Sequence, residues 1–213
     1  MSGDLSGTTI SLIEYDAGNL PSVERALSRQ GVQTERAATP ESIATARVLI
    51  LPGVGHFGQL MRTLASRELL APIREAITAG VPLLGICLGL QALFTSSAEA
   101  PEDRGLDIFP GTVACLPVTA KLPHMGWNQL RRVRPSALLE GVSPDAYFYF
   151  AHSYAALDAG DAAIAMCDHG LPFVAALERD NVFAVQFHPE KSGDAGAQVL
   201  ANFLAYASEG SGR

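Results

Sequence analysis

The chain has few charged residues, few aromatic residues and few cysteines. Of its 213 residues 17% are charged, 7% are aromatic and three are cysteines: Cys87, Cys115 and Cys167. Cysteines so few and so widely spaced provide neither a disulfide framework nor a zinc site, and they indicate a reducing compartment. No apolar run approaches the roughly 20 residues of a membrane-spanning helix. Residues 1–9 lack the basic and apolar regions of an export signal, so we expect a cytoplasmic protein.

Basic clusters are also absent. Lys and Arg total 15 against 22 Asp and Glu, which gives a net charge of −7. This balance argues against nucleic acid and anionic membranes as partners. Hydrophobic residues make up 48% of the chain, enough for the core of one α/β domain. We find no linker or repeat and therefore expect a single domain over residues 1–213, with flexible ends at about 1–7 and 209–213.

Strands and helices alternate in the first half of the chain. Asp16-Ala17-Gly18-Asn19 reads as a turn, Asn19 as a helix N-cap and Gly31 as the end of that helix. Strands are expected at 8–15, 32–37, 47–51 and 81–84, and helices at 20–31, from 40, at 57–64 and at 68–79. This order is typical of a doubly wound, mostly parallel sheet.

The second half has a different pattern. Residues 101–135 are rich in Pro and Gly, and there we expect short strands at best. Further strands are expected at 147–155, 162–167, 173–178 and 182–187, before a closing helix at 193–207. We interpret these strands as an antiparallel or mixed extension of the sheet.

The most informative segment of the chain is the stretch VPLLGICLGLQALF, residues 81–94. It predicts a buried strand, a very sharp turn with Cys87 at its apex, and a helix over its last residues. This is the G-x-nucleophile-x-G arrangement, with Cys in place of Ser. The two glycines allow strand and helix to approach closely, and the helix N-terminus favours the thiolate form of a cysteine. By itself the stretch also fits a buried structural cysteine between two glycines.

A histidine and a carboxylate follow near the end of the chain, in the segment VQFHPEK. The strand before it would bring His188 to the sheet edge where Cys87 lies, since sites of open α/β sheets gather there. A cysteine nucleophile needs a base, and the base is best oriented by a carboxylate such as Glu190. Alone, the HPE sequence also fits a surface turn.

Together, GICLG followed by Gln91 and the later QFHPE resemble the class I glutamine amidotransferases, over nearly the whole chain. The resemblance implies a flavodoxin-like fold and release of ammonia from glutamine through a γ-glutamyl thioester. In that reaction Cys87 would be the nucleophile, His188 the general base and acid, and Glu190 the orienting carboxylate. No cofactor and no metal are implied.

Four further segments are similar to the glutaminase subunits of imidazole glycerol phosphate synthase, in histidine biosynthesis. They are YDAGNL (15–20), PGVGHF (52–57), PHMGWN (123–128) and YFYFAHSY (147–154). The anthranilate and GMP synthase subunits carry a PGG-type loop in place of PGVG, and the GGES-like segment of the pyridoxal phosphate synthase glutaminase is absent. Glu14-Tyr15-Asp16 departs from the usual Asp-Tyr-Gly, which could alter the local turn and interface contacts.

Backbone N–H groups are expected to bind the oxyanion of the thioester reaction. Leu88 follows the nucleophile and is one natural donor, and the loop at Gly53 and Val54 can supply the second. Gln91 is expected to hydrogen-bond the substrate. Three residues resemble the segment that binds the α-amino and carboxylate groups of glutamine: His152, Ser153 and Tyr154.

The resemblance also implies a partner, a TIM-barrel cyclase subunit that forms a heterodimer and uses the ammonia to make imidazole glycerol phosphate and AICAR. An exposed Trp is a typical interface anchor, so Trp127 is predicted at this interface. Tyr149 and Lys191 resemble residues where ammonia leaves. We assign no function to His56 and His169, in loops, and we assign Cys115 and Cys167 to packing.

Several alternatives remain open at this point. PGVG also fits an ordinary turn, Gln91 a polar helix face, His152 a structural histidine, Tyr149 a core aromatic residue and Lys191 a solvated lysine. The protein as a whole could be another amidotransferase subunit, such as that of anthranilate synthase. It could also be a noncatalytic scaffold on the same fold, although an intact Cys87, His188 and Glu190 argue against that.

Overall fold

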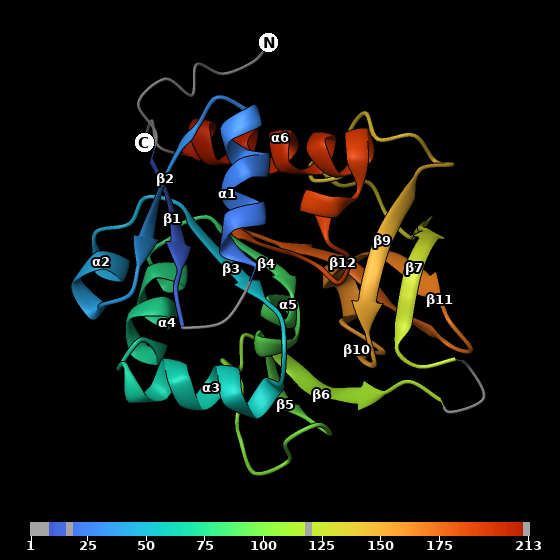
Figure 1. The fold of residues 1–213 in the computed structure, drawn as a ribbon, viewed down its shortest axis with the longest axis horizontal. Coiled ribbons are helices and arrows are strands. Elements are labelled where there is room, and N and C mark those ends of the chain that lie inside the picture. Colours follow the sequence, from blue (N-terminus) through green and yellow to red (C-terminus); the bar gives the residue numbers. More distant parts are fainter. Residues whose placement is uncertain (1–8, 16–18, 118–120, 211–213) are drawn as a thin grey trace.

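The computed structural model describes residues 9–15, 19–117 and 121–210 of the chain. Within these ranges eight strands form one sheet, in the order β2-β1-β3-β4-β13-β12-β11-β8 (Figure 1). They are β1 (Thr9–Ile13), β2 (Gln33–Ala37), β3 (Leu49–Gly53), β4 (Leu83–Cys87), β8 (Arg131–Arg132), β11 (Ala163–Asp168), β12 (Pro172–Arg179) and β13 (Val182–Val185). The pairs from β2 to β13 are parallel and those from β13 to β8 are antiparallel. The predicted doubly wound sheet with an antiparallel extension is confirmed.

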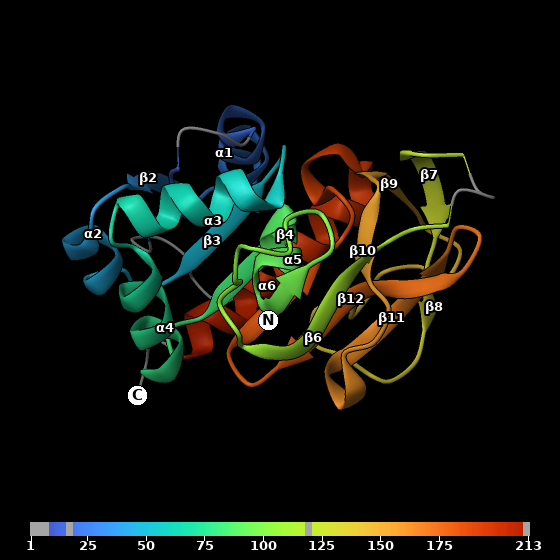
Figure 2. The ribbon, with the colours of Figure 1, turned by 90° about the horizontal axis from the view of Figure 1, so that it is seen from below.

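Helices cover both faces of this sheet (Figures 1 and 2). They are α1 (Leu20–Arg29), α2 (Pro40–Ala44), α3 (Phe57–Ser66), α4 (Leu70–Thr78), α5 (Leu88–Ala92) and α6 (Gly193–Gly210), with short 3-10 helices η1 (Gly160–Ala162) and η2 (Pro189–Lys191). Asn19 is the N-cap residue of α1, but its Oδ1 accepts a hydrogen bond from the Ser22 hydroxyl and not from a backbone N–H. No helix of the described ranges is both long and apolar enough to cross a membrane.

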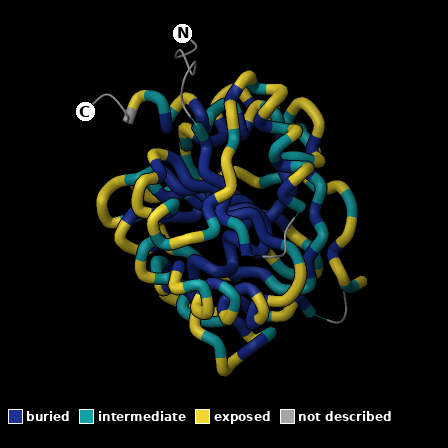
Figure 3. The backbone as a smooth tube through the Cα atoms, turned by 60° about the vertical axis from the view of Figure 1, so that its left-hand side comes forward, coloured by how far each residue is buried: buried dark blue, intermediate teal, exposed yellow. Residues whose placement is uncertain are grey.

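Alternate residues of the central strands face opposite sides of the sheet. Ile50, Ile86 and Val185 join a core cluster with α1 and α6, whereas Leu51 and Leu83 join a second cluster with α3 and α4. Because both faces are covered, these strands are apolar along their whole length. Figure 3 shows the buried segments in the middle of the molecule and the exposed ones around it.

Two smaller sheets lie beside the main one. The first contains β5 (Phe94–Ser97), β6 (Phe109–Cys115) and β10 (Tyr154–Ala156), and the second contains β7 (His124–Gln129) and β9 (Tyr147–His152). The single strand predicted at 147–155 is therefore wrong. The chain leaves one sheet at Ser153 and enters the other, because β9 pairs with β7 and β10 pairs with β6.

The ends of two helices also differ from the prediction. α5 stops before Phe94, which begins β5, and α6 continues to Gly210 beyond the expected end at 207. The predicted flexible segment 1–7, residues 211–213 of the second one and most of the turn at 16–19 lie outside the described residues.

Candidate active site

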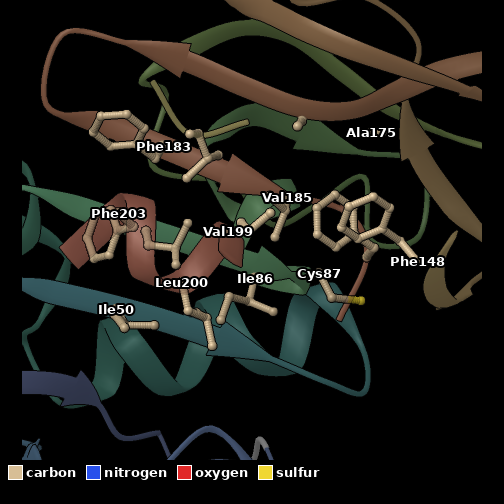
Figure 4. Packing of buried hydrophobic residues seen from close by; sticks show 14 of the residues in the cluster. Ile50, Ile86, Cys87, Phe148, Ala175, Phe183, Val185, Val199, Leu200 and Phe203 are labelled. Carbon is tan, nitrogen blue, oxygen red and sulfur yellow. The ribbon is translucent and has the colours of Figure 1, made fainter. Parts of the chain in front are cut away.

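Cys87 lies at the C-terminal end of β4, directly before α5, and its backbone is strained. Its φ of 55° and ψ of −106° belong to a region that residues other than glycine rarely adopt. The neighbouring glycines are needed for space: a Cβ on Gly85 would lie 2.9 Å from the carbonyl carbon of Gly89, and one on Gly89 would overlap the carbonyl oxygen of Leu51. Figure 4 shows Cys87 at the end of its strand, at the edge of the packed core. The sharp turn predicted from GICLG is present.

Polar groups surround the sulfur of Cys87, which is only 5% exposed. The Gln186 side chain donates from Nε2 to Sγ over 3.6 Å, and the Ala151 carbonyl oxygen lies 4.0 Å from Sγ. The thiol is therefore held in one place, away from bulk water.

His188 and Glu190 form a buried pair beside this thiol. His188 Nδ1 lies 2.9 Å from Glu190 Oε1, and the two side chains are 3% and 1% exposed. The backbone fixes the histidine as well, because its N–H donates to the Tyr149 carbonyl and its own carbonyl accepts from the Ser192 hydroxyl. Glu190 orients one ring nitrogen of the imidazole, which leaves the other free for Cys87.

The environment of His188 favours its protonated form. Burial alone would lower the pKa of His188, but hydrogen bonds and charge interactions with Cys87 and Glu190 outweigh burial and raise the pKa to about 10. An imidazolium next to a cysteine stabilises the thiolate and can act as a general acid. The arrangement therefore has the chemistry of a nucleophile with its proton donor.

A cavity of about 190 Å³ opens at these residues. Most of the predicted site residues line it: Val54, Cys87, Leu88, Gln91, His152, Ser153, Tyr154, His188 and Lys191. Glu190, Gly53, Tyr149 and Trp127 are not among its lining residues. Among the described residues, no group of three or more His, Cys, Asp or Glu side chains is arranged to hold a metal ion.

The two predicted oxyanion donors differ in their surroundings. Leu88 directly follows the nucleophile and lines the cavity. The Val54 N–H, in contrast, donates to the Tyr15 hydroxyl over 3.2 Å. Burial raises the pKa of Tyr15 to about 12, so its hydroxyl stays neutral and can accept this bond. Gly53 has no room for a side chain, because a Cβ there would lie 2.6 Å from that of Leu88.

Gln91 is buried and its side-chain nitrogen is already engaged. Nε2 donates to the Tyr154 carbonyl at 2.8 Å and to Gln186 Oε1 at 3.2 Å. A carboxamide nitrogen has two hydrogens, so only Gln91 Oε1 remains to meet a ligand. The structure thus leaves Gln91 the role of a hydrogen-bond acceptor.

His152 has a structural role in addition to its place in the cavity. Its Nδ1 lies 2.9 Å from the Tyr154 carbonyl, which can only accept, so Nδ1 carries the proton. Its Nε2 then accepts from His124 Nδ1 at 3.1 Å. Burial lowers the pKa of His152 to about 3, and the ring therefore remains neutral.

The predicted interface residues lie on the two-stranded sheet and next to it. Trp127 on β7 is 55% exposed, and its ring contacts that of Tyr149 on β9 at 5.9 Å between centroids. Lys191 Nζ lies 5.6 Å from the centroid of the Tyr149 ring. Since Lys191 also lines the cavity, these three residues connect the exposed face to the site.

Sequence reasoning assigned no role in this site to three of its polar residues: Glu99, Gln186 and Tyr15. Glu99 lines the cavity and accepts a hydrogen bond from the Phe57 N–H at 2.7 Å, and no motif marks it. Gln186 stands inside the QFHPE motif, where its position two residues before His188 could have drawn attention.

The remaining cysteines and histidines are structural or peripheral. Cys167 is buried, as expected of a packing residue, but Cys115 is exposed, so the assignment of Cys115 to packing is wrong. Cys115 is the last residue of β6 and pairs with Tyr154 of β10. His56 caps α3, accepting from the Gly58 N–H, and His169 stacks on His124 at 4.1 Å between ring centroids.

Two comparisons define the class of protein. Residues 11–207 match the family described as glutamine amidotransferase class-I. A solved glutamine amidotransferase shares this fold with a TM-score of 0.73 and 18% identity, over 93% of this chain and 98% of the other. The chain belongs to the class I glutamine amidotransferases, as predicted.

Closer relatives belong to one branch of that family. The imidazole glycerol phosphate synthase subunit HisH of Moorella thermoacetica is 48% identical over 195 residues, which cover 91% of this chain and 93% of the relative. The protein of the same name from Methanothermobacter thermautotrophicus is 48% identical over 196 residues, covering 92% and 97%.

Proposed function

We propose that the chain is the glutaminase subunit of an imidazole glycerol phosphate synthase, acting in histidine biosynthesis in the cytoplasm. It hydrolyses L-glutamine to glutamate and ammonia. The observation that carries this proposal is the buried His188–Glu190 pair beside Cys87 at a cavity. The HisH relatives, with 48% identity over most of both chains, support the particular synthase.

The reaction proceeds in two steps at Cys87. In the first, the thiolate attacks the side-chain amide carbon of glutamine, and His188 protonates the leaving nitrogen, so that ammonia departs and a γ-glutamyl thioester remains. In the second, His188 removes a proton from water, which attacks the thioester and releases glutamate and the thiol. Glu190 keeps the imidazole oriented and stabilises its positive charge in both steps.

The cavity supplies contacts for the two ends of the substrate. Glu99 is a carboxylate on its wall and suits the α-ammonium group, and the main chain at His152 to Tyr154 suits the α-carboxylate. Gln91 Oε1 accepts a hydrogen bond from the substrate. Leu88 N–H binds the oxyanion in each tetrahedral intermediate, and Val54 N–H is the second donor.

The exposed face of β7 and β9 is the surface proposed for the TIM-barrel cyclase subunit. Met125, Trp127 and Tyr147 are 68%, 55% and 54% exposed, and all three belong to this pair of strands. Large apolar side chains gathered on one face are typical of a protein interface. Ammonia leaves past Tyr149 and Lys191, towards this face.

The test of this function compares the isolated subunit with the complex. Co-purification with the cyclase subunit and an increase of glutaminase activity in the complex, with a further increase when the cyclase's nucleotide substrate is bound, are expected. The glutamate that forms together with each ammonia is measured with a coupled assay. Equal rates in all three conditions would contradict the proposed activation, and no ammonia in any of them would contradict the function itself.

Activation by the partner requires the Val54 N–H to leave Tyr15. In the present conformation this donor is bound to the Tyr15 hydroxyl, so a tetrahedral oxyanion would find one donor fewer. One oxyanion donor is worth roughly 10²–10³ in rate. We therefore expect the nucleotide substrate of the partner to favour a reoriented loop at Gly53 and Val54.

Tyr15→Phe is expected to increase the glutaminase kcat of the isolated subunit by about fivefold. The substitution removes only the oxygen that holds the Val54 N–H, and a net hydrogen bond of about 1 kcal/mol corresponds to this factor. The activity of the fully activated complex should change little. Tyr206→Phe is the matched control, since the Tyr206 hydroxyl donates to Asp180, away from the site. A basal rate equal to that of wild type would show that Tyr15 does not restrain the loop.

A further inference from the structure

Gln186 is a fully buried polar residue for which the proposed reaction has no role so far. It follows β13, and its backbone N–H donates to the Ala175 carbonyl on β12 at 2.9 Å. The next residue, Phe187, is also fully buried and packs on Phe148 with ring centroids 4.3 Å apart. These contacts hold the backbone at Gln186 and at the residue after it, and they therefore fix the position from which the Gln186 side chain extends.

A chain of hydrogen bonds sets the orientation of its carboxamide. The Tyr154 carbonyl can only accept, so the group of Gln91 that faces it at 2.8 Å is the amide nitrogen. The same nitrogen faces Gln186 at 3.2 Å, where the oxygen Oε1 must lie. The nitrogen of Gln186 is then the group that faces the Cys87 sulfur, at 3.6 Å.

We propose that Gln186 is a positioning residue for the nucleophile: its Nε2–H holds the Cys87 sulfur, while its Oε1 is fixed by Gln91. This proposal rests on the proposed function of Cys87. A hydrogen bond to an ionised group is roughly twice as strong as one between neutral groups, so the contact strengthens when the thiol becomes a thiolate.

The chemical nature of this donor suits the reaction. A carboxamide has no proton to lose near neutral pH, so it stabilises the thiolate before attack and again when the thioester is hydrolysed, without competing with His188 for the proton. It also keeps one side of the sulfur occupied, which leaves the side facing His188 and the cavity for proton transfer and attack. The chain of hydrogen bonds begins at the Tyr154 carbonyl and ends at the Cys87 sulfur. It therefore links the nucleophile to the segment that is proposed to bind glutamine.

Titratable groups face Cys87 from several elements. Tyr15 follows β1 and interacts with the charge of Cys87. Glu99 follows β5, His152 ends β9, His188 directly precedes η2 and Lys191 ends it, and all four lie on the wall of the same cavity. A substitution at Gln186 replaces none of these titratable residues. A change in the titration of Cys87 therefore reports the loss of the amide donor.

Gln186→Met tests the proposal in the complex with the cyclase subunit. Methionine keeps the length of the side chain but has no N–H donor. We expect the pH midpoint for alkylation of Cys87 by iodoacetamide to rise by about one unit and kcat to fall about tenfold, with KM within about twofold. Alkylation is followed on the Cys87 peptide by mass spectrometry, because Cys115 is exposed. The control is Gln30→Met, since Gln30 donates to the Ala197 carbonyl far from the site.

A second variant keeps the proposal testable if Gln186→Met fails to fold. Gln186→Asn keeps the amide but is one methylene too short to reach both Gln91 and the sulfur, and it should shift the midpoint in the same direction. An unchanged midpoint in a folded variant, with or without a lower kcat, would overturn the proposal, since a purely structural residue would give that result. A wild-type complex that releases no ammonia, together with a shifted midpoint, would instead contradict the proposed function and leave the contact established.

Discussion

Cys87→Ala is expected to lower glutamine-dependent ammonia release by about 10⁴-fold or more. Without the sulfur no thioester can form, and removing the nucleophile of a comparable triad costs about as much as removing all its members. If the proposed cyclase partner takes up ammonia, the complex should still use added ammonium salts, because free ammonia replaces the product of the thioester reaction. The two activities are measured side by side on the same preparation.

The control for this experiment is Cys167→Ala. Cys167 is buried like Cys87 but lies on β11, and it is outside the cavity. Its substitution is expected to leave both activities intact. Glutaminase activity retained in Cys87→Ala would remove the central claim, and loss of the ammonia-dependent activity would indicate damage to the fold or to the complex.

Glu190→Gln is expected to lower the glutaminase kcat by about 10²–10⁴-fold while KM changes little. The amide has the shape of the carboxylate but cannot balance the charge of the imidazolium, and it also favours the wrong tautomer of the histidine. The pKa of His188 should fall, because Cys87 and Glu190 together raise it against the effect of burial. The pKa is measured by NMR titration of the His188 ring.

Glu178→Gln is the matched control for Glu190→Gln. The Glu178 carboxylate is also partly buried, and it accepts hydrogen bonds from the Ser136 hydroxyl and the Leu138 N–H away from the site. This substitution is expected to lower the stability of the fold and to leave kcat unchanged. An unaltered kcat in Glu190→Gln, or a His188 pKa that does not fall, would show that Glu190 has no orienting role.

Local sequence patterns were sufficient for the parallel half of the fold. Strands buried on both faces, such as β3 and β4, are continuous apolar runs, and each is followed by a turn residue or a helix signal. The break at Ser153 could not be predicted in the same way. YFYFAHSYA is one uninterrupted β pattern, and only the different partners β7 and β6 divide it into β9 and β10.

The sequence by itself determined the turn at Cys87 and the adjacency of His188 and Glu190. In both cases the residues are neighbours in the chain. The flanking glycines allow the sharp turn at Cys87, and the proline between His188 and Glu190 restricts the backbone that separates them. It also indicated the family, because GICLG and QFHPE are local motifs.

Only the tertiary structure decided which distant groups come together at the site of the nucleophile and which hydrogen bonds they make there. The carboxylate of Glu99, the amide of Gln186 and the hydroxyl of Tyr15 come from separate segments, and their contacts depend on the packing of the sheet against its helices. Local patterns carry no information on such contacts, since burial and hydrogen-bond partners are set by the whole fold. Val54 is an example. The sequence predicted its N–H as an oxyanion donor, but it could not show that this N–H donates to the Tyr15 hydroxyl in the folded chain.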